Sequence, residues 1–426
     1  MLASTRRGPM TMNRKAILLL ASTGVLQAGN SDPVVQEPVA SDCWLTPILN
    51  IRARYEFGDV DGKDSSNALT FRERLGLKTK EWHGFSALVE GEFTEVAGSD
   101  YNANAGPLAY PYDRANSAIP DPRNAELNQA LLQYEGFDTT VKAGRQRLIY
   151  DNAAFIGNVG WRQNEQTFDA ISLSNKSITG LTLNYAYLNQ VNRIYGAEAD
   201  SPLTTKPLFD NVQDIAANVN LFNVSYTGIK GVTLGGYAYL MDFRDKPNWN
   251  NNTFGLSAKG DLLGLTLYGE LAWQDHAGFN ANDQASYAHF IATKSFGEQT
   301  LALSVEHLGA GFKTPLATVH VFNGYADAFV AGRVEGNHRG LTDVSLSHTL
   351  PVFYGIQWTN VLHAFGDDTI STDYGWEYDS VLVKKFDEHF TALVKLAMFE
   401  SEGDPFVGTA SLPATTRISM ELDYTY

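Results

Sequence analysis

The 426-residue sequence contains one cysteine, Cys43, and no apolar run that approaches the roughly 18 residues of a membrane-spanning helix. A single thiol excludes an internal disulfide framework and any metal site built from several thiolates. Charged residues make up only 19% of the chain and aromatic residues reach 12%, which does not fit a disordered acidic protein. Because 32 basic residues face 48 acidic ones, for a formal net charge of -16, nucleic acid is not an expected partner.

The N-terminal segment has the features of a secretory signal peptide. Arg14 and Lys15 precede an apolar stretch over residues 16–26, and the small residues Ala28 and Gly29 follow it. The stretch is too short to cross a bilayer stably, and no second apolar segment follows that could stop its transfer. We expect a signal peptide over residues 1–29, with a buried N-terminal helix as the alternative.

From about residue 45 onward, apolar and polar residues alternate repeatedly over roughly ten positions. This period of two indicates strands with two unlike faces, whereas helical periodicity is nearly absent. A soluble sandwich would also alternate, so periodicity alone does not decide what bathes the outside. The clearest alternating segments are 51–57, 85–93, 181–187, 222–226, 232–240, 265–273, 301–305, 356–362, 390–398 and 418–426.

The connections between these segments alternate strictly between short and long. Nine long connections imply about eighteen strands, in an up-and-down antiparallel barrel with tight turns at one rim and loops at the other. The long connections fall at 58–68, 96–124, 149–166, 191–216, 243–251, 275–283, 311–340, 365–373 and 401–414.

A barrel of about eighteen strands encloses water, because side chains fill the interior only up to about eight strands. Its apolar exterior then requires lipid, and closure removes the sheet edges that a bilayer does not tolerate. The sequence therefore predicts an all-β transmembrane barrel in the cell outer membrane, with short periplasmic turns and long extracellular loops. We expect residues 30–44 to form a short periplasmic segment and residues 45–426 to form one barrel domain.

Six arginines form three pairs at a spacing of two, which places each pair on one face of a predicted strand. A cation on the lipid face near the middle of the bilayer costs about 2 to 4 kcal/mol, so we expect these pairs in the lumen or above the membrane. Guanidinium groups bind carboxylates through two parallel hydrogen bonds, and a row of them lets an acidic solute pass between weak sites. Structural pairing with lumen acids is the alternative. The pairs are Arg52 with Arg54, Arg72 with Arg74, and Arg145 with Arg147.

Two long segments, 126–169 and 315–343, resemble porins of the alginate-export type. The first includes Gly144-Arg145-Gln146-Arg147 and the second His320 and Asp327. The resemblance implies an eighteen-stranded monomer with an electropositive constriction that passes an anionic polyuronate, and it looks closer to the broad porin branch than to the dedicated exporter. It also implies that Arg145 and Arg147 line the wall and that Arg162 and Glu165 belong to a loop folded toward the channel. Segment 311–340 would then be a plug or rim element.

Motifs for catalysis and metal binding are missing from the sequence. The nine histidines include no His-Glu-x-x-His pair, and no Gly-x-Ser-x-Gly marks a nucleophile at a strand-to-helix turn. We therefore expect a passive channel for anionic solutes rather than an enzyme, without a cofactor, and with structural Ca²⁺ at extracellular loops as a minor option. A channel without anion selectivity, or a barrel that captures substrate and is plugged by its loops, is the alternative. Expected partners are outer-membrane lipid and lipopolysaccharide, anionic saccharides, and the barrel-assembly machinery through the C-terminal strand.

Overall fold

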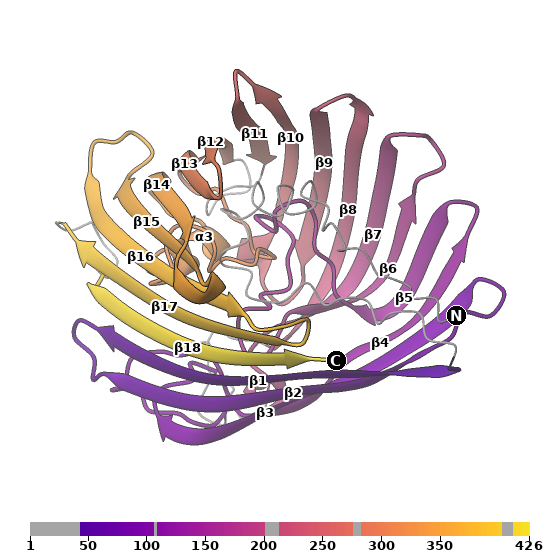
Figure 1. Cartoon of the computed structure of the whole chain (residues 1–426), viewed down its shortest axis with the longest axis horizontal. Helices are drawn as coiled ribbons and strands as arrows, with labels where there is room; N and C mark the ends of the chain where they lie inside the picture. The colour runs from indigo at the N-terminus through magenta and orange to yellow at the C-terminus, as the bar shows by residue number, and fades with distance from the viewer. Residues whose placement is uncertain (1–42, 106–108, 201–212, 276–282, 403–411) are drawn as a thin grey trace, which may run out of the picture.

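The computed structural model describes residues 43–105, 109–200, 213–275, 283–402 and 412–426. Eighteen strands form one antiparallel sheet that closes on itself, because β1 pairs with both β2 and β18 (Figure 1). The strands are β1 (Leu45–Val60), β2 (Ser66–Thr79), β3 (Phe85–Asp100), β4 (Asn124–Gly136), β5 (Thr139–Gln146), β6 (Thr167–Asn175), β7 (Leu181–Asn192), β8 (Asp214–Ile229), β9 (Val232–Phe243), β10 (Asn251–Leu262), β11 (Leu265–Asp275), β12 (Gln284–Phe296), β13 (Gln299–Leu308), β14 (Leu341–Pro351), β15 (Gln357–Gly366), β16 (Asp373–Lys385), β17 (Phe390–Ser401) and β18 (Thr415–Thr425). The predicted signal peptide over residues 1–29 lies outside the described residues.

Eight of the nine connections predicted to be long are longer than every turn at the other rim. The link expected at 58–68 shortens to 61–65, because β1 and β2 continue beyond their expected ends. Three long extracellular connections matter for the site and are named L2 (101–123, between β3 and β4), L3 (147–166, between β5 and β6) and L7 (309–340, between β13 and β14). L7 contains the short helix α3 (Val330–Glu335), and the described chain also has the 3-10 turns η1 (Ala197–Asp200), η2 (Pro247–Trp249) and η3 (Phe353–Gly355). No helix among the described residues is long and apolar enough to cross a membrane.

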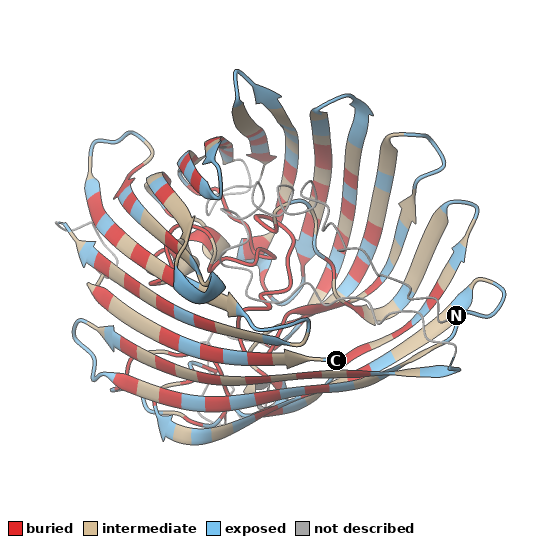
Figure 2. Cartoon of the chain, viewed as in Figure 1, coloured by how far each residue is buried: buried red, intermediate tan, exposed pale blue. Residues whose placement is uncertain are grey.

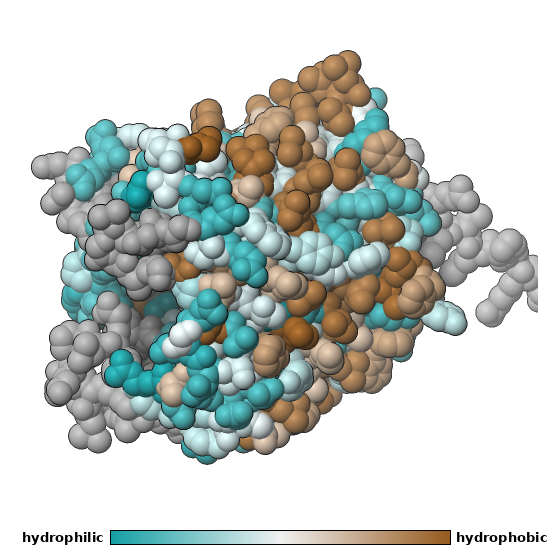
Figure 3. Space-filling view, turned by 90° about the vertical axis from the view of Figure 1, so that its left-hand side faces the viewer, coloured by the Kyte–Doolittle hydropathy of each residue, from teal (hydrophilic) through white to brown (hydrophobic). Residues whose placement is uncertain are grey.

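The two faces of the wall differ in the way that alternation predicts. In β1 the side chains of Arg52, Arg54 and Glu56 are buried, while the residues between them are half-buried (Figure 2). The opposite face carries large apolar side chains, such as Leu132 and Leu271, each 67% exposed. Figure 3 shows hydrophobic side chains gathered over much of the outer surface, with hydrophilic ones concentrated toward one end. A closed barrel with this apolar exterior is a multi-pass protein of the outer membrane.

Part of the interior is filled by L3 and L7, which fold into the barrel (Figure 1). Phe155 of L3 and Phe312 of L7 pack together and against Tyr287 of the wall. The two loops also pair through their backbones, since the amide of Gly157 donates to the carbonyl of Leu316 at 2.8 Å. L3 and L7 therefore form one packed unit inside the barrel.

Candidate functional site

Four of the predicted arginines lie side by side on the inner wall of β1 and β2. Arg52 stands directly opposite Arg72, Arg54 lies one step above, and Arg74 lies one step below. Like charges directly opposite each other destabilise a sheet unless acids separate them. The geometry of this wall therefore requires acidic neighbours.

Barrel closure supplies two of these acids from β18. Asp423 is the register partner of Arg52, and Glu421 is the register partner of Arg54. The Nε of Arg52 lies 2.7 Å from Oδ1 of Asp423, and Nη2 of Arg54 lies 3.1 Å from Oε1 of Glu421. On the other flank, Nε of Arg74 lies 2.6 Å from Oε2 of Glu92 on β3. The arginines of β1 and β2 are therefore flanked on one side by acids of β18 and on the other by an acid of β3.

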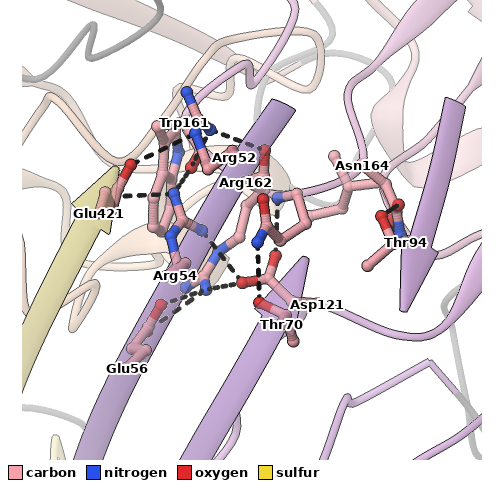
Figure 4. A network of polar contacts seen from close by, with 12 residues as sticks. Arg52, Arg54, Glu56, Thr70, Thr94, Asp121, Trp161, Arg162, Asn164 and Glu421 are labelled. Atoms are coloured by element: carbon pink, nitrogen blue, oxygen red, sulfur yellow. Dashed lines mark hydrogen bonds and ion pairs between the residues drawn. The ribbon is translucent and has the colours of Figure 1, made fainter. Parts of the chain in front are cut away.

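The loops complete the site from above. Arg162 of L3 reaches Glu56 at 3.0 Å and Asp121 of L2 at 3.3 Å, and Arg54 also contacts Asp121, at 3.0 Å. Figure 4 shows Arg54 and Arg162 converging on Asp121 beside the ring of Trp161. Backbone carbonyls of L3, including that of Trp161, accept hydrogen bonds from Arg52 and Arg54. L3 is therefore anchored on the arginines by main-chain and side-chain contacts.

Arg147 and Glu165 close the lower side of L3. Arg147 pairs with Glu165, and its Nη2 lies 2.6 Å from Oε1 of Glu90 on β3. Glu165 also lies 3.5 Å from Arg74 and accepts a hydrogen bond from Asn158. We name the set of Arg52, Arg54, Arg72, Arg74, Arg147 and Arg162 the arginine cluster.

Arg145 does not belong to this cluster and does not face the lumen, which was one of the two places expected for its pair. Its register partners are Ala130 and Asp169, and Asp169 is flanked by two buried inner residues, Phe168 and Ala170. Arg145 and Asp169 therefore point to the outside of the barrel, where their side chains form a double hydrogen bond at 2.7 and 3.1 Å. Residues at a spacing of two share a face only within one strand, and β5 ends at Gln146. Arg147 therefore already belongs to L3 and turns inward.

Several charged residues of the site were not singled out from the sequence as site residues. Arg417 of β18 pairs with Glu56 at 3.3 Å, and Lys395 of β17 contacts His320 of L7 at 2.6 Å. Arg417 lies one position before the last predicted segment, 418–426, and shares the parity of its polar residues Glu421 and Asp423, so extending that segment by one residue would have placed Arg417 on the inner face. Asp121 lies in a proline-rich stretch without periodicity, so no sequence pattern predicts that it belongs to the site.

His320 links L7 to the wall and to L3. Its Nδ1 lies 2.8 Å from Oδ1 of Asp327 and its Nε2 is close to Nζ of Lys395, while its ring stacks on Trp161. Nε2 can accept from the ammonium group only when the imidazole is neutral. Burial and the positive charge of Lys395 lower the pKa of His320 well below its usual value, and Asp327 opposes that shift.

Acidification is expected to loosen the contact between L7 and the wall. Asp327, Lys395, Arg162, Trp161 and Tyr325 surround the ring of His320. When L7 is released, the imidazole of His320 takes up a proton near pH 6.5, whereas in the packed loop it stays neutral. Below that pH, the ratio of released to packed L7 therefore rises by up to about tenfold per pH unit. The conductance should therefore rise as the pH falls from about 7 to 4. His320→Gln, which cannot gain a proton, should flatten this profile, and an unchanged profile would contradict the assignment.

The site is neutral as a whole and covered. Arg52, Arg54, Arg72, Arg74 and Arg162 are each at most 1% exposed. Eight cations face eight acids. The cations are Arg52, Arg54, Arg72, Arg74, Arg147, Arg162, Lys395 and Arg417, and the acids are Glu56, Glu90, Glu92, Asp121, Glu165, Asp327, Glu421 and Asp423. No group of three or more His, Cys, Asp or Glu side chains in the described ranges is arranged to hold a metal ion.

Several solved structures share this architecture at low sequence identity. OpdQ of Pseudomonas aeruginosa superimposes with a TM-score of 0.64 at 14% identity, over 91% of this chain and 99% of that one. OccAB3 of Acinetobacter baumannii gives 0.65 at 12% identity, over 90% and 99%. OpdK of Pseudomonas aeruginosa, solved with vanillate, gives 0.64 at 11% identity, over 89% and 98%. No family profile and no curated protein matches the sequence. The chain therefore has the fold of the eighteen-stranded outer-membrane porins.

Proposed function

We propose that this protein is an outer-membrane channel that passes anionic solutes, with acidic oligosaccharides or polysaccharides of the uronate type as the leading class. The observation that carries the proposal is the concentration of arginines on the inner wall of β1 and β2, directly beneath L3 and L7. Guanidinium groups suit carboxylates because they offer two parallel donors. Vanillate, the compound named with the OpdK structure, has a carboxylate as well.

Passage requires L2, L3 and L7 to move, because the arginines are covered in the packed state. Moving the three loops removes Arg162 and three acids, Asp121, Glu165 and Asp327, whereas Arg147 directly follows β5 and stays beside Glu90 of the wall. Of the eight cations and eight acids, seven cations and five acids then remain on the wall. Within this set positive charge is in excess, which favours anions over cations at this side of the lumen.

Reversal potentials in a KCl gradient across a planar bilayer test this proposal. The variant Arg52→Gln/Arg54→Gln removes two cations, and each acid they contact keeps another partner, because Asp423 keeps Arg72, Glu421 keeps Lys395 and Asp121 keeps Arg162. We expect the wild type to prefer chloride and the variant to lose this preference. Lys384→Gln/Lys385→Gln, at the periplasmic rim, is a control that removes the same charge outside the lumen. A wild type and an arginine double variant with equal reversal potentials would show that the arginines only brace the wall.

A second candidate is a substrate-capturing barrel that stays plugged by its loops. The burial of five arginines to 1% exposure or less favours it. Planar-bilayer conductance separates the two candidates, because a channel gives ohmic current and a plugged barrel that is correctly folded gives none.

The remaining expectations are part of the same proposal. We infer a monomer of the alginate-export-type porin family, from its broad porin branch rather than the dedicated exporter, inserted by the barrel-assembly machinery through β18 and bathed by lipid and lipopolysaccharide. Detergent-resistant trimers on native gels would contradict the inference that the protein is a monomer.

A further inference from the structure

An extracellular cavity of about 560 Å³ lies beside the arginine cluster, at the mouth of the barrel. It is walled by the link between β1 and β2, by L2, by L7 and by the start of β18. This volume is within the range of small-molecule sites, which is roughly 300 to 1,000 Å³. Four separate parts of the chain therefore build one concave site above the covered lumen.

Three cations from three of these parts line the cavity. Lys63 comes from the link between β1 and β2, Arg114 from L2, and Arg417 from β18. Lys63 and Arg114 are exposed, whereas Arg417 is set into the wall with 12% of its side chain exposed. The lining therefore carries three cations and one acid, although the whole chain carries a net charge of -16.

Arg417 is held in place and still has a donor to offer. Its Nε donates to the carbonyl of Ala326 at 2.9 Å, and its Nη1 reaches Glu56 and the carbonyl of Ala118 at 3.3 and 3.1 Å. Its Nη2 makes no hydrogen bond with any described residue and is not shielded from solvent. A rigid guanidinium edge therefore opens onto the cavity.

The lining acid does not cancel this charge toward the cavity. Asp327 is already bound by His320 at 2.8 Å and by Arg162 at 3.3 Å. Other lining groups are neutral and polar, among them Asn102, Asn116 and the hydroxyl-bearing Tyr112. The cavity thus offers cationic donors for a carboxylate, with amides and an aromatic ring beside them.

We propose that this cavity is a capture site for the carboxylate of an acidic sugar before it enters the lumen. The carboxylate binds the Nη2 edge of Arg417, with Lys63 and Arg114 supplying further positive charge. The amides of Asn102 and Asn116 bind ring hydroxyls, and Tyr112 packs on the sugar ring. The choice of an acidic sugar rests on the proposed function. Because Arg417 also holds L7 through Ala326 and L2 through Ala118, a ligand bound here contacts the residue that ties both loops to the wall.

Calorimetry on the detergent-purified full chain tests the site, with digalacturonate as the probe and lactose as a neutral disaccharide of similar size. The double variant Lys63→Glu/Arg114→Glu changes exposed residues only, so the fold is preserved. Lys230→Glu/Lys176→Glu, at two periplasmic turns, introduces the same charge change at the other rim. We expect digalacturonate to bind, lactose not to bind, and the extracellular variant to lose at least tenfold in affinity while the periplasmic variant keeps it. Arg417→Lys should weaken binding as well, because lysine lacks the forked donor edge.

Each outcome decides one of the two proposals. Equal affinity in the wild type and in the extracellular variant overturns the capture site, as does equal binding of lactose or no binding of digalacturonate. The proposed channel is judged separately by reversal potentials. A wild type without anion preference that still loses digalacturonate affinity in the extracellular variant would overturn the selective channel and support the capture site.

Discussion

Replacing Gly157 by valine is expected to raise the single-channel conductance several-fold. Gly157 is where L3 meets L7, and a Cβ at this position would lie 2.9 Å from Cβ of Ala153 and 3.0 Å from Cβ of Thr318. The Cβ would also overlap the hydroxyl of Thr318 in L7, so a valine side chain must push L7 away from L3. Because L3 and L7 cover the arginine cluster, their separation opens the lumen.

The matched control for this variant is Gly269→Val in β11. A Cβ at Gly269 meets no atom within 4 Å, so valine fits there without displacing anything. We expect Gly269→Val to conduct like the wild type in planar bilayers. If Gly157→Val folds into the heat-resistant barrel and conducts no better than this control, L3 and L7 do not close the lumen.

The second large effect is a difference in reversal potential between Arg147→Ala and Arg145→Ala, although the two arginines stand two positions apart in the sequence. Arg147→Ala is expected to shift the reversal potential toward cations, because it leaves Glu90 and Glu165 of the lumen without the guanidinium they share. Arg145→Ala is expected to leave the reversal potential unchanged, because Arg145 and its partner Asp169 face the outside. Both changes remove one positive charge and the same atoms, so each variant is the control for the other.

Stability measurements complete this comparison. Arg145→Ala should lower the unfolding temperature, because Asp169 loses its partner on the wall and the carbonyl of Leu127 loses a donor. If Arg145→Ala shifts the reversal potential as strongly as Arg147→Ala, Arg145 reaches the lumen and its assignment to the outer face is wrong.

The strand count and the sequence of turns and loops could be predicted from the chain because both are local properties. Period-two alternation and the spacing of polar breaks depend only on neighbouring residues. Arg52 and Arg54 were correctly placed on the inner face for the same reason, since both lie within one continuous strand. The same local rule misplaced Arg145, because the end of β5 at Gln146 carries no composition signal.

The acids of β18 and L2 that neutralise the arginines could not be assigned from the sequence. Glu421 and Asp423 lie about 370 positions from Arg52 and Arg54 and become their neighbours only when β18 closes on β1. Asp121 and His320 reach the site on loops whose paths are set by packing against the wall and against each other. Lys395 was not singled out from the sequence.

The sequence by itself determined a closed barrel of about eighteen strands, because alternation over short segments and the lengths of their connections suffice for that. Only the tertiary structure decided which charges meet, since barrel closure and the inward folding of L2, L3 and L7 bring together residues that no local pattern relates. The physical reason is that a strand sets the direction of its own side chains, whereas an ion pair requires the positions of two chain segments at once.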